Sequence, residues 1–226
     1  MQSDGLVSIT AAWVKETLEG AEAGHDWWHI QRVWNNAITL AKGEDADLFI
    51  VEMAALLHDI ADSKFHNGNE EIGPQKALEF LNTLHVPEET THRIVDIIRN
   101  ISFKGGHGVT PDSIEFKIVQ DADRLDAMGA IGIDRAFHYG GFKNRELYNP
   151  EVPPRPGMSK EEYKSSTAPT INHFYEKLLL LKDRMNTRTG KMMAEERHRF
   201  MEQYLQQFYS EWEGNASNAQ TSAENQ

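Results

Sequence analysis

The chain contains no cysteine, which excludes disulfide bonds and cysteine-ligated zinc sites. It has no run approaching the roughly 18 apolar residues of a membrane-spanning helix, and its N-terminus lacks the pattern of a secretory signal. Basic residues are also scarce: 23 Lys and Arg against 35 Asp and Glu give a net charge of −12. This charge disfavours bulk electrostatic binding to nucleic acid or to an anionic membrane. We therefore expect a cytoplasmic protein with neither partner.

The alternating apolar and polar runs that are typical of β-strands are missing as well, and no internal repeat is present. Apolar residues instead recur at helical spacing nearly throughout, which predicts an all-α fold. The expected helices cover about residues 8–20, 26–42, 48–59, 70–84, 87–101, 112–126 and 127–137, with a long loop that includes Gly140, Gly141 and residues 149–157, and two closing amphipathic helices, the first around residues 171–185.

A length of 226 residues fits one domain with a sizeable core. We predict a single compact helical domain over residues 1–213, which includes a C-terminal helical pair at 160–213. Residues 214–226 consist mainly of Asn, Ser, Ala, Gln and Glu without periodicity, so we predict a disordered tail there. Exposed apolar positions on the last helix would allow a homodimer.

Two helix starts carry capping signals, and one aromatic cluster has an ambiguous pattern. Asp45 or Asp47 can cap the helix that follows them. Asp112 with Glu115 three residues later is a capping-box pattern. The tryptophans of the second helix are more often core than a base-stacking platform, and we assign them to the core; they are Trp27, Trp28 and Trp34.

The most apolar helical segment runs over residues 48–57 and leaves almost no polar face, which is typical of a buried helix. This helix ends in His58 and Asp59, and Asp62 follows three residues later. Burying a carboxylate without a partner is costly. A metal ion bound by these side chains is the simplest compensation, although a capped helix end with a satisfied core histidine is the structural alternative.

Two other helices offer the missing ligands. His25 and His29 are four residues apart, so they would share one helix face. Asp123 lies in a third helix, between Asp121 and Asp126. One histidine, the adjacent His–Asp pair and one aspartate would make a His₂Asp₂ set. Such a mixed set suits Mn²⁺, Fe²⁺, Co²⁺, Ni²⁺ or Zn²⁺ better than Mg²⁺, and an octahedral ion would keep open positions for water or substrate.

The order His…His-Asp…Asp, in the segments Leu56-Leu57-His58-Asp59-Ile60 and Asp121-Ala122-Asp123-Arg124-Leu125, resembles the HD-domain superfamily of metal-dependent phosphohydrolases. Residues 25–33, 101–103 and 121–132 further resemble its YedJ/YpgQ-like subgroup, and the resemblance extends over about residues 8–213. It implies a compact helical bundle with a metal at its centre. The implied metal ligands are His29, His58, Asp59 and Asp123.

Asp123 is favoured over Asp126 because the ligand of the family directly precedes a basic residue, here Arg124. Members of the superfamily mostly cleave phosphate esters or anhydrides. The subgroup is associated with pyrophosphate release from nucleoside triphosphates, particularly deoxy forms, and we expect Mn²⁺ as the ion. The alternatives are a phosphomonoesterase acting on nucleotides or other small phosphates, a non-catalytic metal- or nucleotide-binding sensor, and a purely structural helical protein.

Asp62 and Lys64 are the expected catalytic residues beyond the ligands. Asp62 would orient or deprotonate the attacking water, whereas the structural alternative is an exposed residue past the helix end. Lys64 and Arg124 would neutralise phosphate oxygens because both lie beside ligands in the sequence. The alternative for each is a salt bridge to one of the many acids.

The remaining expected substrate contacts come from two further segments. His25 could contact a substrate phosphate or a second ion, or it could be a polar cap of its helix. The loop from Lys104 to His107 is rich in glycine and could form a lip over the substrate, although its glycines could serve only the turn.

Overall fold

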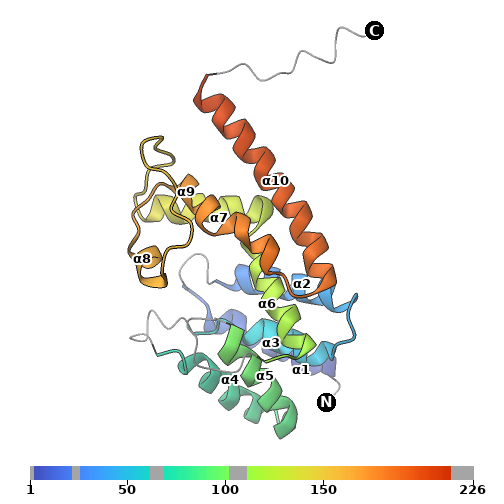
Figure 1. The fold of residues 1–226 in the computed structure, drawn as a ribbon. Helices are drawn as coiled ribbons and strands as arrows, with labels where there is room; N and C mark the ends of the chain where they lie inside the picture. Colours follow the sequence, from blue (N-terminus) through green and yellow to red (C-terminus); the bar gives the residue numbers. More distant parts are fainter. Residues whose placement is uncertain (1–2, 22–25, 62–68, 102–110, 215–226) are drawn as a thin grey trace. The chain divides into compact units, whose positions relative to one another are not determined.

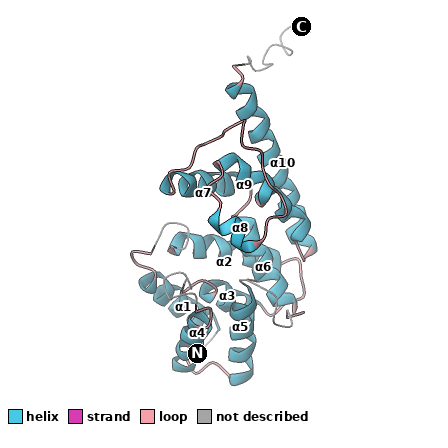
Figure 2. Ribbon diagram, turned by 60° about the vertical axis from the view of Figure 1, so that its left-hand side comes forward, coloured by secondary structure: helices cyan, strands magenta, loops and turns pink. Residues whose placement is uncertain are grey.

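The computed structural model of the chain describes residues 3–21, 26–61, 69–101 and 111–214. The described residues form helices and loops without any strand (Figures 1 and 2), which confirms the all-α prediction. The helices are α1 (Ser3–Thr17), α2 (Trp27–Ala41), α3 (Leu48–Leu57), α4 (Ile72–Thr83), α5 (Glu88–Ile101), α6 (Ile114–Asp126), α7 (Gly129–Phe142), α8 (Lys160–Ser165), α9 (Thr170–Glu176), the 3-10 helix η2 (Leu178–Arg184) and α10 (Arg188–Trp212).

The chain divides into two compact units. Unit 1 comprises Met1–Ala127 and Asp183–Met192, and unit 2 comprises Met128–Lys182 and Met193–Gln226. The prediction of one domain over residues 1–213 stays a prediction, and the predicted tail lies outside the described residues apart from Gly214.

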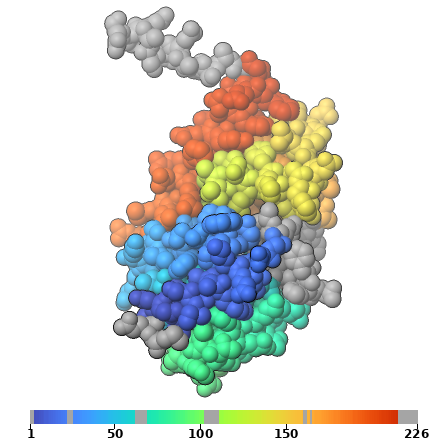
Figure 3. All heavy atoms as spheres, turned by 180° about the vertical axis from the view of Figure 1, so that it is seen from behind, coloured from blue at the N-terminus to red at the C-terminus, as the bar shows by residue number. Residues whose placement is uncertain are grey.

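Helix α3 forms the core of unit 1, where α1, α2, α5 and α6 pack against it. Its apolar side chains are almost completely shielded, with Ile50 at 1% exposure and Val51, Leu56 and Leu57 at 0%. Each such side chain contributes roughly 1.5–3 kcal/mol of burial free energy. Figure 3 shows α1 and α2 (blue) covering one face of this unit beside α4 and α5 (green). The helix that ends in His58 is therefore held rigidly by its neighbours.

The two helices that lead to the candidate site begin at side-chain caps. Asp26 caps α2 by accepting a hydrogen bond from the backbone N–H of His29 at 2.9 Å. Asp47, rather than Asp45, caps α3 and accepts from the N–H groups of Phe49 and Ile50. These caps satisfy backbone donors that a helix start leaves unpaired.

The expected capping box at Asp112 is wrong. Ser113 caps α6 and accepts from the backbone N–H of Phe116. Asp112 instead pairs with Lys117, and Glu115 is buried, where Arg93 approaches it at 3.1 Å. Asp112 and Ser113 can both cap a helix, so the ion pairs that the neighbouring side chains form decide between them.

In unit 2, the predicted boundaries of two helices are wrong. Helix α7 continues through Gly140 and Gly141 to Phe142. Gly140 lies against Thr170 of α9 so closely that an added Cβ would meet Thr170 Oγ1 at 2.2 Å, so this glycine serves helix packing and not a loop. The helix expected around residues 171–185 is α9 followed by the 3-10 helix η2. Helix α8 has no counterpart of its own among the expected helices.

Unit 2 also holds a buried hydrogen bond between two titratable groups. The hydroxyl of Tyr163 contacts Nδ1 of His173. Burial, together with the charges of Lys177 and Arg145, lowers the pKa of His173 to about 3. The neutral imidazole therefore accepts a hydrogen bond from the tyrosine, and a proton on Nδ1 would break it.

Two expectations concern exposed surface. The assignment of Trp28 to the core is wrong, since 58% of this residue is exposed. Trp34 is half-buried and donates its indole N–H to Glu52.

The exposed apolar residues Phe200 and Trp212 lie on α10, and the homodimer stays a prediction. None of the described helices combines the length and apolar composition that crossing a membrane requires.

Candidate metal centre

Four of the predicted ligands meet in unit 1. His29 comes from the first turn of α2, His58 and Asp59 follow α3, and Asp123 lies in α6. Asp123 Oδ1 is 3.7 Å from His29 Nε2 and 3.9 Å from His58 Nε2. Asp59 Oδ2 is 3.9 Å from His29 Nε2. Three helices thus bring two imidazoles and two carboxylates close together, with both carboxylates near His29 Nε2.

These separations suit a shared cation. With bonds of about 2.1 Å, two ligand atoms lie about 3.0 Å apart when adjacent in an octahedron and about 4.2 Å apart when opposite. His29, His58 and Asp59 each place one ligand atom within 4.8 Å of the others. The histidine side chains are 3–4% exposed, whereas Asp59 is 18% and Asp123 is 41% exposed. The imidazoles therefore form the closed side of the site, and Asp123 borders its open side.

The hydrogen bonds of His58 leave one ring nitrogen available to a cation. His58 Nδ1 donates to the backbone carbonyl of Ala55 at 2.8 Å, so the lone pair of the neutral ring is on Nε2. His58 Nε2 is buried and has no hydrogen-bond partner among the described residues. Burial lowers the pKa of His58, while the nearby Asp123 opposes this and His29 adds to it. A neutral imidazole with a buried, unpaired Nε2 is the form that binds a divalent metal.

His29 also bonds through Nδ1 and turns Nε2 toward the site, but its partner is a carboxylate and not a backbone carbonyl. Its Nδ1 lies 2.8 Å from Oδ2 of Asp126 and donates to this carboxylate, so Nε2 faces Asp59 and Asp123. Arg32 Nε in turn donates to Asp126 Oδ1 at 2.6 Å. Asp126 is the aspartate over which the sequence favours Asp123 as the ligand, and sequence reasoning misses Arg32. The available signal is the spacing of His29 and Arg32, which are three residues apart on one face of α2.

Asp121, which also flanks Asp123 in the sequence, has a structural role. It is 0% exposed and accepts hydrogen bonds from the backbone N–H groups of Asn186 and Thr187 at 2.8–3.0 Å. Arg124 lies 3.7 Å from Asp121, and its Nη1 donates to the carbonyl of Arg184. Arg124 therefore makes the ion pair that is its structural alternative. Its contact with a substrate phosphate stays a prediction.

The other predicted catalytic and substrate residues lie outside the described part of the chain; they are His25, Asp62, Lys64, Lys104 and His107.

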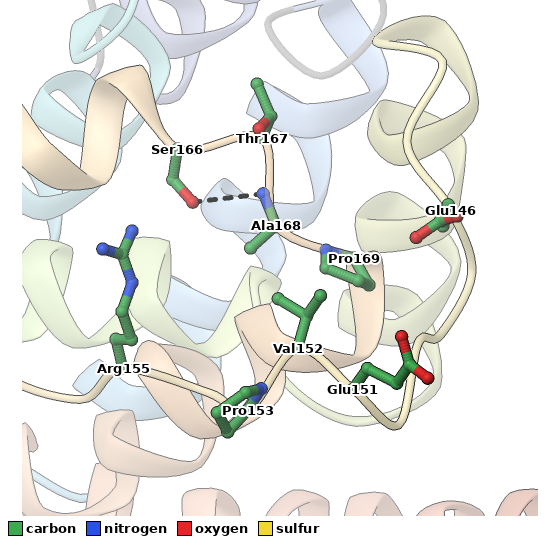
Figure 4. Close-up of a pocket in the computed structure, with 9 residues that line it drawn as sticks. All are labelled: Glu146, Glu151, Val152, Pro153, Arg155, Ser166, Thr167, Ala168 and Pro169. Atoms are coloured by element: carbon green, nitrogen blue, oxygen red, sulfur yellow. Dashed lines mark hydrogen bonds between the residues drawn. The ribbon is translucent and has the colours of Figure 1, made fainter.

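Unit 2 contains a separate hollow of about 360 Å³ (Figure 4). Its described lining includes Glu146, Glu151 and Arg155 but no histidine. Figure 4 shows the side chain of Ser166 turned back to the N–H of Ala168, a bond of 3.2 Å within the loop itself. The donor set that suits a transition metal is therefore the one in unit 1.

An all-α fold with this His…His-Asp…Asp constellation defines the class of HD-domain proteins, which bind divalent metals. The HD domain family model matches residues 27–128, a range that begins with α2, ends just after α6 and includes all four candidate ligands. The chain is also 43% identical over 197 residues to YpgQ of Bacillus subtilis, which covers 86% of this chain and 88% of that protein. The protein therefore belongs to the HD superfamily of metal-dependent phosphohydrolases.

Two solved structures are similar to this chain over most of its length and support this family membership. A crystal structure of an HD-superfamily hydrolase from Bacillus thuringiensis matches with a TM-score of 0.77 and 47% identity, covering 95% of this chain and 100% of that one. Bacillus subtilis YpgQ in complex with ADP matches with a TM-score of 0.74 and 38% identity in the aligned structures, covering 93% and 97% of the two chains.

Proposed function

We propose that this protein hydrolyses nucleoside triphosphates, with deoxy forms favoured, and releases pyrophosphate. The required divalent ion, for which Mn²⁺ is the leading candidate, would be held by His29, His58, Asp59 and Asp123. The observation that carries the proposal is the convergence of these donors around the unpaired Nε2 of His58. An isolated buried acceptor costs about 1–3 kcal/mol, and a bound cation would remove this cost.

A nucleotide substrate is supported by the relative and by charge. YpgQ of Bacillus subtilis was crystallised with ADP. This chain has a net charge of −12, and the carboxylates of Asp59 and Asp123 alone would repel a polyphosphate. A divalent ion between them offsets that repulsion locally, so substrate binding and metal binding are coupled.

A divalent ion at this site supplies two kinds of chemistry, because it polarises a phosphoryl oxygen and lowers the pKa of an attacking water toward neutrality. Because Nδ1 of each ring bonds to an acceptor, His29 and His58 would each present the lone pair of Nε2 to the ion. Asp123 is the most exposed of the four ligands, so the phosphates would approach from its side. Asp62 is proposed to orient the water for in-line attack.

Positive side chains would stabilise charge on the phosphate oxygens, where most of the barrier to phosphoryl transfer is reduced. Lys64 and Arg124 are proposed for this role. Arg124 would have to exchange the carbonyl of Arg184 for a phosphate oxygen, a change that its position one residue after Asp123 allows. His25 and the segment from Lys104 to His107 are proposed to contact the substrate.

The test is a panel of nucleoside and deoxynucleoside triphosphates, nucleoside monophosphates and simple phosphate esters, assayed with Mn²⁺, Co²⁺ and Mg²⁺. We expect a nucleoside monophosphate and pyrophosphate from triphosphates, with Mn²⁺ giving the highest rate. His58→Ala and Asp59→Ala should lose both metal and turnover. His92→Ala is the matched control, because this α5 side chain is 67% exposed and has no role in the scheme.

Other results would contradict the proposal. Orthophosphate released only from monoesters would identify a phosphomonoesterase. Nucleotide binding without any product after long incubation would identify a sensor. Full activity of metal-free Asp59→Ala would show that the reaction does not depend on a metal bound at this site.

A further inference from the structure

The carboxylate of Asp126 lies behind the metal centre and bonds through both of its oxygens. Oδ2 accepts from His29 Nδ1 at 2.8 Å and from Arg32 Nη2 at 3.1 Å. Oδ1 accepts from Arg32 Nε at 2.6 Å. The side chain of Asp126 is only 2% exposed and that of His29 only 3%. The contact between Asp126 and His29 is therefore shielded from solvent, while the Arg32 side chain is 32% exposed. All of these are charge-assisted hydrogen bonds, which are the strongest kind in proteins.

The two histidines of the site are thus oriented by unlike acceptors. His58 donates to a backbone carbonyl, which is neutral, whereas His29 donates to a carboxylate. A carboxylate acceptor on one ring nitrogen fixes the tautomer and raises the basicity of the other nitrogen. The guanidinium of Arg32 fixes the carboxylate and compensates its buried charge, which would otherwise be costly.

We propose that Asp126 is a positioning residue of the metal centre. It keeps the proton of His29 on Nδ1, directs the Nε2 lone pair at the ion and raises the affinity of the site for it, while Arg32 holds Asp126 in that orientation. The inference rests on the proposed function in one respect, since it takes His29 as a metal ligand.

Asp126→Asn tests this because the amide cannot replace the carboxylate. If the amide oxygen faces His29, the amide nitrogen faces the Nε–H donor of Arg32. If the amide nitrogen faces His29, it favours the tautomer with the proton on Nε2, which leaves no lone pair on Nε2 for the ion. Loss of such an outer partner typically weakens metal affinity about 10- to 100-fold.

Asp121→Asn is the matched control. Asp121 is another buried carboxylate of α6, five residues earlier, but its partners are Asn186 and Thr187 and not a histidine. Its replacement should reduce stability and leave the dissociation constant for Mn²⁺ within about twofold of the unchanged protein. Asp126→Glu keeps the charge and should restore part of the affinity that Asp126→Asn loses.

The experiment titrates Mn²⁺ into the metal-free full chain by calorimetry and reads the tautomer of His29 by ¹⁵N NMR of the imidazole without metal. We expect Nδ1–H in the unchanged protein, and in Asp126→Asn a dissociation constant at least tenfold higher with a shift toward Nε2–H. An Nε2–H tautomer in the unchanged protein, or Mn²⁺ affinity of Asp126→Asn equal to that of Asp121→Asn, would overturn the proposal.

The two proposals fail in different ways. If the unchanged protein binds no Mn²⁺, the proposed function fails and the claim about metal affinity fails with it, and the tautomer measurement then decides the remaining claim, that Asp126 keeps the proton of His29 on Nδ1. Loss of Nδ1–H in Asp126→Asn supports it, and full retention of Nδ1–H overturns it. If Asp126→Asn does not fold, the tautomer of the unchanged protein and the Mn²⁺ affinity of Asp126→Glu still decide it.

Discussion

Replacing His58 with leucine should abolish stabilisation by metal while changing the metal-free protein little. The substitution removes the hydrogen bond to Ala55, a loss of about 0.5–1.5 kcal/mol. It also removes the buried, unpaired Nε2, which costs about 1–3 kcal/mol in the metal-free protein. The two effects have opposite signs and similar size, so the free energy of unfolding without metal should change by about 1 kcal/mol or less.

The effect with metal is larger. A ligand present at 100 times its dissociation constant stabilises the folded state by about 2.7 kcal/mol. For a chain of this length, that free energy raises the Tm by about 5–10 °C. We expect this shift when Mn²⁺ is added to the metal-free protein, and we expect no shift in His58→Leu.

The assay is thermal unfolding of each protein after chelation and again after addition of Mn²⁺. His198→Leu is the matched control, because His198 is another buried histidine with one ring nitrogen, Nδ1, that has no hydrogen-bond partner in the described part of the chain, but it lies in unit 2. It should keep the full shift of the unchanged protein. A shift of equal size in His58→Leu would refute the reasoning, since the ion would then be stabilising the fold from somewhere else.

Three further predictions concern stability and are measured by chemical denaturation. His173 is neutral in the folded protein because burial lowers its pKa to about 3, so only the unfolded state gains a proton as the pH falls below 6.5. Between pH 7 and pH 5, the free energy of unfolding of the unchanged protein should therefore fall by about 2 kcal/mol more than that of His173→Gln. Equal decreases in the two proteins would contradict this. Gly190→Ala should destabilise by about 1–3 kcal/mol, because its Cβ would lie 2.5 Å from a buried carboxylate oxygen. Gly141→Ala, whose Cβ would meet no atom of the described residues within 4 Å, should stabilise α7 by about 0.5 kcal/mol. Ser113→Ala should lower the free energy of unfolding by about 1 kcal/mol because it removes a helix cap, whereas Asp112→Ala should have no measurable effect. A larger loss in Asp112→Ala than in Ser113→Ala would show that Asp112 caps the helix.

The parts of the site that could be predicted are those with local signals. A helix that is apolar all round has to be buried, so the composition of α3 alone predicts that His58 and Asp59, which follow it, lie at the core. Capping preferences narrow the start of α3 to two aspartates, one of which caps it. The order of the four candidate ligands in helical contexts is enough to identify the superfamily.

The parts that could not be predicted depend on contacts between distant segments. Asp126 meets His29 across 97 residues of sequence, and Asp121 meets Asn186 across 65. Both aspartates stand close to Asp123 in the chain, so spacing alone could not assign one to the back of the metal centre and the other to the start of α10. Gly140 resembles a loop residue because the contact that requires it, with Thr170, exists only when α7 and α9 are packed together.

The sequence by itself therefore determined that this protein is helical, that its most buried helix ends in a His–Asp pair, and which side chains could complete a metal site. Tertiary structure decided which ring nitrogen each histidine presents, which aspartate bonds to His29, and which glycine serves packing. The physical reason is that burial and helix periodicity are encoded in neighbouring residues, whereas a hydrogen-bond partner is chosen by whichever donor or acceptor the packing of other helices brings within about 3 Å.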